Sequence, residues 1–128
     1  IYGHFAGDYV LKKLATILKH TCRDSDIVSR YGGEEFFILL PETLPKNAFQ
    51  FAEKIRQQVD KTSFIFNNET IKVTISIGVS VKTPDMNYDL NDLISCADKG
   101  LYKAKNSGKN QTILYKSFNI ANLENVKV

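Results

Sequence analysis

The stretch Ser29–Pro41 reads SRYGGEEFFILLP, and it joins two apolar segments through two glycines and two carboxylates. Residues 26–31 and 35–40 carry the apolar residues typical of short strands, so we predict two strands connected at Gly32 and Gly33. Glycine adopts positive φ without steric cost, which suits a tight turn between strands. The sequence therefore predicts a β-hairpin whose end carries the two carboxylates.

The two carboxylates at the end of this hairpin allow two interpretations. Adjacent side chains of a strand point to opposite faces, so one of Glu34 and Glu35 can face a ligand while the other faces away. A turn without side chains also lets a ligand approach the backbone closely. On composition alone, a surface hairpin with two solvated glutamates is the simpler interpretation.

Length and composition indicate one domain of ordinary size. The chain has 128 residues, 43% of them hydrophobic, and no apolar run long enough to span a membrane. The formal net charge of +3 permits an anionic ligand, but no basic block indicates a nucleic-acid partner. Cys22 and Cys96 show no metal-ligand spacing, which favours free thiols in a reducing compartment.

Hydrophobic periodicity predicts helices alternating with strands along the rest of the chain. Helices are predicted over residues 8–21, 45–59 and 89–107, and further strands over 64–66, 71–81 and 111–115. The strongest signal is at 71–81, where isoleucine and valine alternate with polar residues and glycine, as in a half-buried strand. Asn67 and Asn68 suit the turn of a hairpin before it, and Gly108 suits the end of the last helix. We predict an α+β fold in which helices flank a central, mostly antiparallel sheet.

Several separated motifs, in the same order, resemble those of the GGDEF family, the diguanylate cyclases. The hairpin turn carries the family signature in its GGEEF form, from Gly32 to Phe36. The other matching motifs are Tyr2-Gly3-His4-x-x-Gly7-Asp8, Arg23-x-x-Asp26, Ser76-Ile77-Gly78-Val79, Ala97-Asp98-x-x-Leu101-Tyr102-x-Ala104-Lys105 and Gly108-Lys109-Asn110. The resemblance implies a fold similar to the adenylate cyclase catalytic domain and the polymerase palm. It places a catalytic domain at residues 1–115 and a C-terminal tail at 116–128.

The resemblance also implies an activity, a cofactor and partners. Members of the family condense two GTP molecules into cyclic di-GMP and release two pyrophosphates. Each protomer holds one GTP, so an antiparallel homodimer is expected. Mg²⁺, with Mn²⁺ as an alternative, is the expected cofactor, because divalent cations activate a hydroxyl nucleophile and stabilise charge on a phosphate. A cytoplasmic location is expected, with membrane attachment only through upstream segments.

Within the signature, the resemblance assigns roles to four residues. Glu34 is the expected metal ligand, and it would help to deprotonate the ribose 3′-hydroxyl. Glu35 is the second signature carboxylate, and it would support the position of the metal or of the hydroxyl. Gly32 and Gly33 would let the backbone approach the nucleotide.

The resemblance assigns substrate contacts to four further residues. Asp8 would hydrogen-bond the guanine edge, and Leu11, one helical turn later, would pack against the base. Lys105 and Lys109 would bind the terminal phosphates, and their spacing would place them on one side of a helix. Each residue has an ordinary alternative. Asp8 could be an acid favoured in a first helical turn, Leu11 a core residue, and the lysines a solvated helix end.

Arg23 and Asp26 form an RxxD motif a few residues ahead of the signature turn. Family members with this motif at this spacing bind the product there and are inhibited by it, so the resemblance implies an allosteric cyclic di-GMP site. A guanidinium can donate two hydrogen bonds to a phosphate or a guanine. The alternative is a loop salt bridge that contributes little to stability.

The sequence departs from the family pattern at three places. The family's aspartate metal ligand and guanine-binding asparagine lie just upstream of the Tyr-Gly-His motif, and the chain begins at Ile1, so we expect the natural protein to continue upstream. Lys109 stands where arginine is usual, which keeps the charge but loses the bidentate geometry. Gly100 stands where alanine is usual, and glycine inside a helix costs about 1 kcal/mol.

Two rival functions stay open from the sequence. The first is a degenerate module that binds GTP or cyclic di-GMP without catalysis, against which the intact carboxylate pair argues. The second is an interaction scaffold with no nucleotide site.

Overall fold

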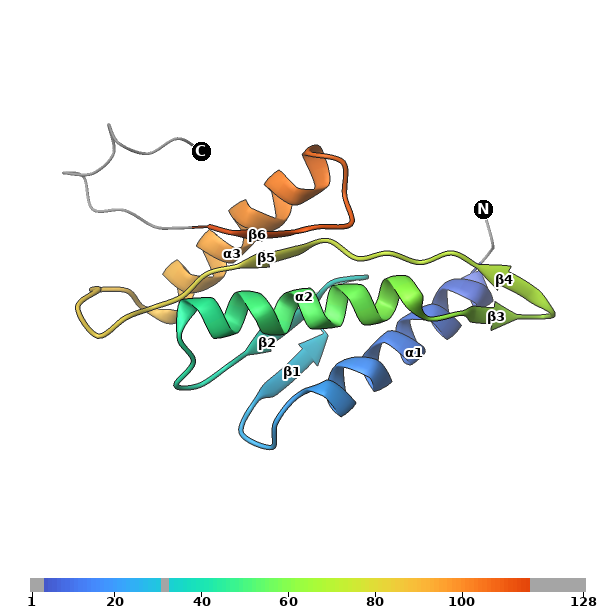
Figure 1. The fold of residues 1–128 in the computed structure, drawn as a ribbon, viewed down its shortest axis with the longest axis horizontal. Helices are drawn as coiled ribbons and strands as arrows, with labels where there is room; N and C mark the ends of the chain where they lie inside the picture. The colour runs from blue at the N-terminus through green and yellow to red at the C-terminus, as the bar shows by residue number, and fades with distance from the viewer. Residues whose placement is uncertain (1–3, 31–32, 116–128) are drawn as a thin grey trace. The chain divides into compact units, whose positions relative to one another are not determined.

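The computed structural model describes residues 4–30 and 33–115 (Figure 1). In chain order, the elements are α1 (His4–Thr21), β1 (Ile27–Arg30), β2 (Phe36–Leu39), α2 (Pro45–Lys61), β3 (Phe64–Phe66), β4 (Glu69–Ile71), β5 (Ile77–Val79), α3 (Leu90–Asn106) and β6 (Thr112–Leu114). The chain divides into two compact units, with the boundary between Ile75 and Ser76. The predicted tail at 116–128 lies outside the described residues.

The strands of the described residues form three two-stranded sheets. β1 pairs with β2 and β3 with β4 in antiparallel fashion, whereas β5 and β6 are parallel. Parallel neighbours need a long crossover connection, and α3 supplies it between β5 and β6. The combination of helices with mostly antiparallel strand pairs confirms the predicted α+β class.

The three predicted helices are all present, with bounds that differ by a few residues. α1 begins at His4 rather than at residue 8, and α2 ends at Lys61 rather than at residue 59. α3 ends at Asn106, and Gly108 follows it with a φ of +108°, a left-handed conformation that suits glycine and stops a helix. None of the described helices is both long enough and apolar enough to cross a membrane.

The predicted single strand over residues 71–81 is wrong in its extent. β4 ends at Ile71, β5 begins at Ile77, and residues 72–76 pair with no strand among residues 4–30 and 33–115. Exposure does alternate at the start of this stretch, because Val73 and Ile75 are half-buried and Thr74 is exposed. Apolar residues at every second position indicate an extended backbone with one buried face. A strand also requires a hydrogen-bonded neighbour, which this pattern does not predict.

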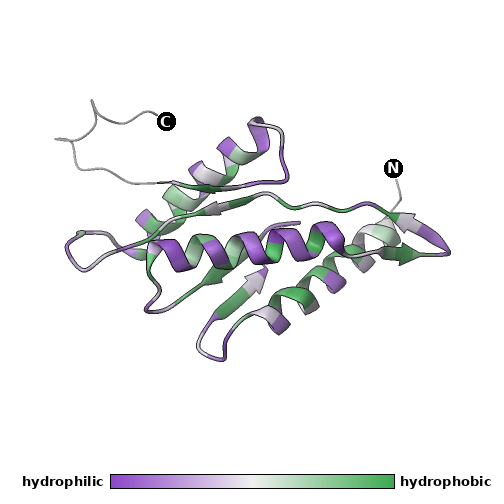
Figure 2. Ribbon diagram, in the orientation of Figure 1, coloured by the Kyte–Doolittle hydropathy of each residue, from purple (hydrophilic) through white to green (hydrophobic). Residues whose placement is uncertain are grey.

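The first unit is built around apolar stripes on α1 and α2. α2 buries Ala48, Ala52, Ile55 and Val59, which recur at helical spacing, and Figure 2 shows hydrophilic and apolar residues alternating along this helix. The facing stripe of α1 contributes Ala6, Leu14, Ile17 and Leu18 to the buried set. α1 and α2 contact each other, so the two stripes form a common core.

Lys13 fixes α1 against β3. Its ammonium lies 5.3 Å from the Phe64 ring centroid and donates a hydrogen bond to the Ser63 carbonyl at 3.0 Å. Phe64 is completely buried, so the lysine stem covers apolar surface while its charge reaches a backbone acceptor. Tyr9, one helical turn earlier, packs against Phe66 with ring centroids 5.5 Å apart and the ring planes tilted by 37°.

The hairpin of β3 and β4 confirms the predicted turn at the two asparagines. Phe66 pairs with Glu69, which leaves a two-residue connection. Asn67 and Asn68 have φ values of +52° and +66°. Two consecutive positive φ values are the signature of a type I′ turn, and asparagine is among the few residues that tolerate them.

In the second unit, α3 packs on β5 and β6 through two glycines. A β-carbon added at Gly78 would lie 2.0 Å from the Ala97 carbonyl oxygen, and one added at Gly100 would lie 3.2 Å from the Gly78 α-carbon. The helix and the strand therefore touch backbone to backbone. Gly100, where alanine is usual in the family, is buried in this contact.

Both cysteines are free thiols, as predicted. Cys96 is buried, and Cys22 is half-buried at the end of α1. Burial raises the pKa of each thiol, because the charged thiolate is poorly solvated inside the protein. A raised pKa lowers the thiolate fraction at neutral pH, so neither thiol is activated for reaction.

Candidate functional site

The quoted stretch forms the predicted hairpin. β1 and β2 pair antiparallel from Ile27 opposite Leu39 to Arg30 opposite Phe36, so the ladder ends at Arg30 and Phe36. Gly32, one of the two predicted nucleotide-approach residues, lies outside the described residues, whereas Gly33 is exposed. Glu34 and Glu35 therefore lie between β1 and β2, at the end of the ladder where Arg30 pairs with Phe36.

The carboxylates Glu34 and Glu35 differ in exposure. Glu34 is exposed within the turn, and Glu35 is half-buried at the edge of β2. Glu34 is thus the signature carboxylate that solvent, a cation or a nucleotide reaches more readily.

Sequence reasoning missed Arg30, which fixes the turn. Its Nε donates a hydrogen bond to the Gly33 carbonyl oxygen at 2.8 Å, and its Nη2 donates to the same oxygen. The signal in the sequence is the place of Arg30 three residues before Gly33, since a guanidinium at that spacing can reach the turn backbone.

The donor set at the turn suits a cation that also binds phosphate. Within the described part of the chain, no group of three or more His, Cys, Asp or Glu side chains could hold a metal ion. A dedicated protein cage is therefore not seen there. Mg²⁺ is commonly held by one or two carboxylates, with water and substrate phosphates completing its shell, and Glu34 and Glu35 fit that pattern.

Asp8 and Leu11 lie on α1, one turn apart. Asp8 is exposed and Leu11 is half-buried. Because α1 includes His4, Asp8 lies beyond the first helical turn, and the alternative of a dipole-stabilising first-turn acid does not apply. Leu11 is absent from the buried core, so it keeps surface for a ligand.

Arg23 and Asp26 form an ion pair in the loop between α1 and β1, with Nη2 and Oδ1 2.9 Å apart. The Asp26 side chain is fully covered, whereas 56% of the Arg23 side chain is exposed. The hydrogen bond from the guanidinium lowers the pKa of Asp26 below its ordinary value and raises the pKa of Arg23 above its own. The pair is therefore charged across the physiological range.

Lys105 and Lys109 both belong to the second unit, but they do not share a helix face. Lys105 lies in the last turn of α3 and is exposed. Lys109 is exposed too, yet it follows the end of the helix with a φ of +59°, and its N–H donates to the Ala104 carbonyl at 3.0 Å. The expected helical spacing is wrong, because Gly108 turns the chain before Lys109 is reached.

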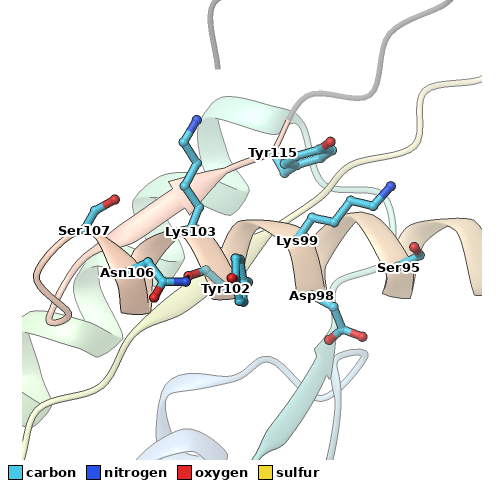
Figure 3. Close-up of a pocket in the computed structure, with 8 residues that line it drawn as sticks. All are labelled: Ser95, Asp98, Lys99, Tyr102, Lys103, Asn106, Ser107 and Tyr115. Carbon is cyan, nitrogen blue, oxygen red and sulfur yellow. The ribbon is translucent and has the colours of Figure 1, made fainter.

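A second feature of this unit lies on the exposed side of α3 (Figure 3). An open depression there is lined by Ser95, Asp98, Lys99, Tyr102, Lys103, Asn106, Ser107 and Tyr115. Lys99 places its ammonium 5.8 Å from the Tyr115 ring centroid, a cation–π contact. This depression includes neither of the two lysines expected to bind phosphate.

Comparison with known families identifies the class of the protein. The model of the family described as "Diguanylate cyclase, GGDEF domain" matches residues 1–111. The chain therefore belongs to the GGDEF domain family, which confirms the resemblance found in the sequence.

Similar proteins with known names agree with this assignment. The chain is 43% identical over 119 residues to Diguanylate cyclase A of Treponema denticola, with 91% of this chain and 31% of the relative covered. It is 38% identical over 117 residues to Diguanylate cyclase DosC of Escherichia coli, with 91% of this chain and 25% of that protein covered. The chain thus spans less than a third of the length of these two relatives.

Solved structures show the same fold. The active GGEEF domain of a diguanylate cyclase from Vibrio cholerae superimposes with a TM-score of 0.77 at 37% identity, covering 91% of this chain and 73% of that one. The GGDEF domain of DgcB from Caulobacter crescentus, solved in complex with c-di-GMP, gives a TM-score of 0.83 at 26% identity, covering 89% and 67%.

Proposed function

We propose that this GGDEF domain condenses two GTP molecules into cyclic di-GMP and releases two pyrophosphates. The observation that carries the proposal is the exposed Glu34 beside the exposed Gly33, at the end of a hairpin that bears the family signature. The names of the similar proteins support the same activity. Because the chain spans only part of those relatives, the activity is proposed for the full-length parent protein.

In this proposal, Glu34 and Glu35 have separate tasks. Glu34, the exposed carboxylate, binds the cation together with the substrate phosphates and helps to remove the proton of the 3′-hydroxyl. Glu35, the half-buried second signature carboxylate, supports the position of the metal or of the hydroxyl. Mg²⁺, when bound, stabilises the charge that gathers on the α-phosphate and acidifies the attacking hydroxyl.

The reaction then follows from bringing two nucleotides together. The 3′-oxygen of each GTP forms a bond to the α-phosphorus of the other, and in each case the bond from that phosphorus to the oxygen shared with the β-phosphate breaks. Two phosphodiester bonds form, two pyrophosphates leave, and each 3′-hydroxyl loses its proton. Each protomer binds one GTP, so turnover requires a homodimer. Asp8 hydrogen-bonds the guanine edge and Leu11 packs on the base, while Lys105 and Lys109 bind the terminal phosphates of the substrate.

Product inhibition through the RxxD motif is part of the proposal. The exposed guanidinium of Arg23 can bind a phosphate or a guanine of cyclic di-GMP, and the covered Asp26 orients it. The test compares the ratio of inhibited to uninhibited rate in the parent protein and in Arg23→Ala. We expect added cyclic di-GMP to lower the rate of the parent. The rate of Arg23→Ala should be the same with and without added cyclic di-GMP.

The activity itself is tested by incubating the full-length parent with GTP and Mg²⁺ and separating the products by chromatography. We expect cyclic di-GMP from the parent and from Glu69→Gln, a matched change of an exposed glutamate on β4, and none from Glu34→Gln. Binding of a non-hydrolysable GTP analogue without any product would favour the degenerate binding module. An absence of both binding and product would favour the scaffold.

A further inference from the structure

Arg23 and Asp26 lie at the end of the hairpin opposite to the signature turn. Asp26 immediately precedes β1, and the last ladder pair at this end joins Ile27 to Leu39. Pro41 and Thr43 follow β2 in the chain. The base of the hairpin is therefore formed by the residues just before β1 and just after β2.

Asp26 is held by several hydrogen bonds from Arg23. Its Oδ2 accepts the backbone N–H of Arg23 at 2.8 Å, and its Oδ1 accepts from Nη2 at 2.9 Å and from Nε at 3.2 Å. The side chain of Asp26 has no exposed surface. An ion pair in which both partners are solvated contributes little, but this carboxylate is covered and bound by three donors.

The same guanidinium crosses the base of the hairpin. Nη2 of Arg23 donates to the Pro41 carbonyl at 3.1 Å and to Thr43 Oγ1 at 3.0 Å. The Thr43 hydroxyl donates in turn to the Pro41 carbonyl at 3.0 Å. We call Arg23, Asp26, Pro41 and Thr43 the hairpin clasp, because together they join the segment before β1 to the segment after β2.

The clasp matters because the hairpin is short. β1 and β2 have four residues each, and within the described residues they pair only with each other. The ends of short strands open more readily than their centres, so contacts at the base of the hairpin resist its opening. A carboxylate must keep its position within a fraction of an ångström to act on a reacting group.

We propose that Arg23 and Asp26 are positioning residues that hold the base of the hairpin closed and thereby fix the turn that carries Glu34. This role acts in the absence of any product, so it is separate from product inhibition. Its kinetic part rests on the proposed cyclase function. Its structural part, the closed base, can be tested without any activity.

The experiment uses the full-length parent and four variants of the clasp: Arg23→Ala, Arg23→Lys, Asp26→Asn and Thr43→Val. Arg56→Ala is the matched control, because Arg56 makes an equivalent i,i+3 ion pair with Glu53 on α2, with Nε and Oε2 2.7 Å apart. Hydrogen exchange of the β1–β2 peptides is measured first. Initial rates are then measured with a phosphodiesterase present to remove cyclic di-GMP.

We expect Arg23→Ala and Asp26→Asn to speed exchange in residues 27–39 by about tenfold, because the lost clasp bonds no longer resist local opening. We expect kcat to fall by about three- to tenfold, with KM for GTP within about twofold, because placement of the carboxylate is a property of the bound complex. Arg23→Lys restores part of kcat, Thr43→Val gives a smaller effect, and the control matches the parent.

Two results would overturn the proposal. Unchanged exchange in residues 27–39 for both Asp26→Asn and Thr43→Val would show that the clasp does not hold the hairpin. Faster exchange with an unchanged kcat would show that the closed base does not position the turn. If the parent itself makes no product, the proposed function fails, and the exchange measurement still decides whether the clasp exists. If Arg23→Ala does not fold, Thr43→Val carries the same test.

Discussion

Arg30 and Gly33 are joined across the signature turn, because Nε of the arginine donates to the glycine carbonyl at 2.8 Å. A peptide unit is planar, so fixing this carbonyl also fixes the N–H and the α-carbon of Glu34. Glycine has the widest choice of backbone conformations, so a hydrogen bond to Gly33 removes freedom that this residue would otherwise keep. The arginine thus reduces the number of positions from which the exposed carboxylate can act.

We predict that Arg30→Ala lowers the rate of cyclic di-GMP formation by about tenfold, the loss expected when a charged donor no longer orders a catalytic turn. Arg30→Lys should give an intermediate rate, because lysine keeps the charge without the forked donors. The melting temperature should stay close to that of the parent, since Arg30 is exposed. A parent-like rate in Arg30→Ala would contradict the role of this contact.

Acid should weaken the base of the hairpin. The hydrogen bond from Arg23 lowers the pKa of Asp26 below 3.8 in the folded protein. A lowered folded pKa gives a stability contribution that is present above the unfolded value and is lost as the pH falls through the folded value. In Asp26→Asn, urea unfolding at pH 7 and at pH 3 should therefore show a smaller difference than in the parent. Asp24→Asn, a change at an exposed neighbour, is the control.

Gly78→Ala should be strongly destabilising. Its β-carbon would lie 2.0 Å from the Ala97 carbonyl oxygen and 2.3 Å from the Leu101 nitrogen, both of them backbone atoms. Overpacking of this kind costs about 3 kcal/mol or more. Gly7→Ala on α1 is the matched control, because nothing lies within 4 Å of its added β-carbon, and it should gain about 0.5–1 kcal/mol from helix propensity. Chemical denaturation measures both, and a parent-like Gly78→Ala would refute the close contact.

Thr112→Val should stabilise the second unit. Thr112 is 8% exposed, and no donor or acceptor among residues 4–30 and 33–115 hydrogen-bonds its hydroxyl. A buried polar group without a partner costs about 1–3 kcal/mol, so replacing the hydroxyl by a methyl group should gain about 1 kcal/mol. Valine also keeps the β-branch that suits β6. Thr112→Ser retains the hydroxyl and loses the methyl group, so it should unfold at a lower temperature than the parent.

The sequence predicts best where the signal is local. The helix stripes, the signature hairpin and the asparagine turn follow from periodicity and turn chemistry, and all are found near their predicted positions. The strand predicted over residues 72–76 is not found. Alternation of apolar and polar residues is a local property of the sequence, whereas strand pairing depends on a segment elsewhere in the chain. The prediction that Lys109 shares a helix face with Lys105 is wrong for a similar reason. Gly108 adopts a left-handed conformation and ends the helical spacing before Lys109.

The side-chain contacts that hold the hairpin cannot be predicted from local sequence patterns. Arg23 belongs to a motif that the sequence shows, yet its hydrogen bonds to Pro41 and Thr43 cross the base of a hairpin, and nothing in the motif specifies them. For Arg30, the sequence pattern indicates only a place in a strand. Long, flexible side chains acquire their partners from the folded backbone, so such contacts emerge only once the chain is placed in three dimensions.

The contact between Gly78 and Gly100 also limits which substitutions the sequence can accept during evolution. At position 78, every other residue type would press a side chain into the helix backbone, so that site is closed to ordinary substitution. At position 100, alanine would need its neighbours to move by only a few tenths of an ångström, since its nearest contact would be 3.1 Å. Lineages descending from this gene should therefore exchange glycine and alanine on the helix while keeping the strand position unchanged.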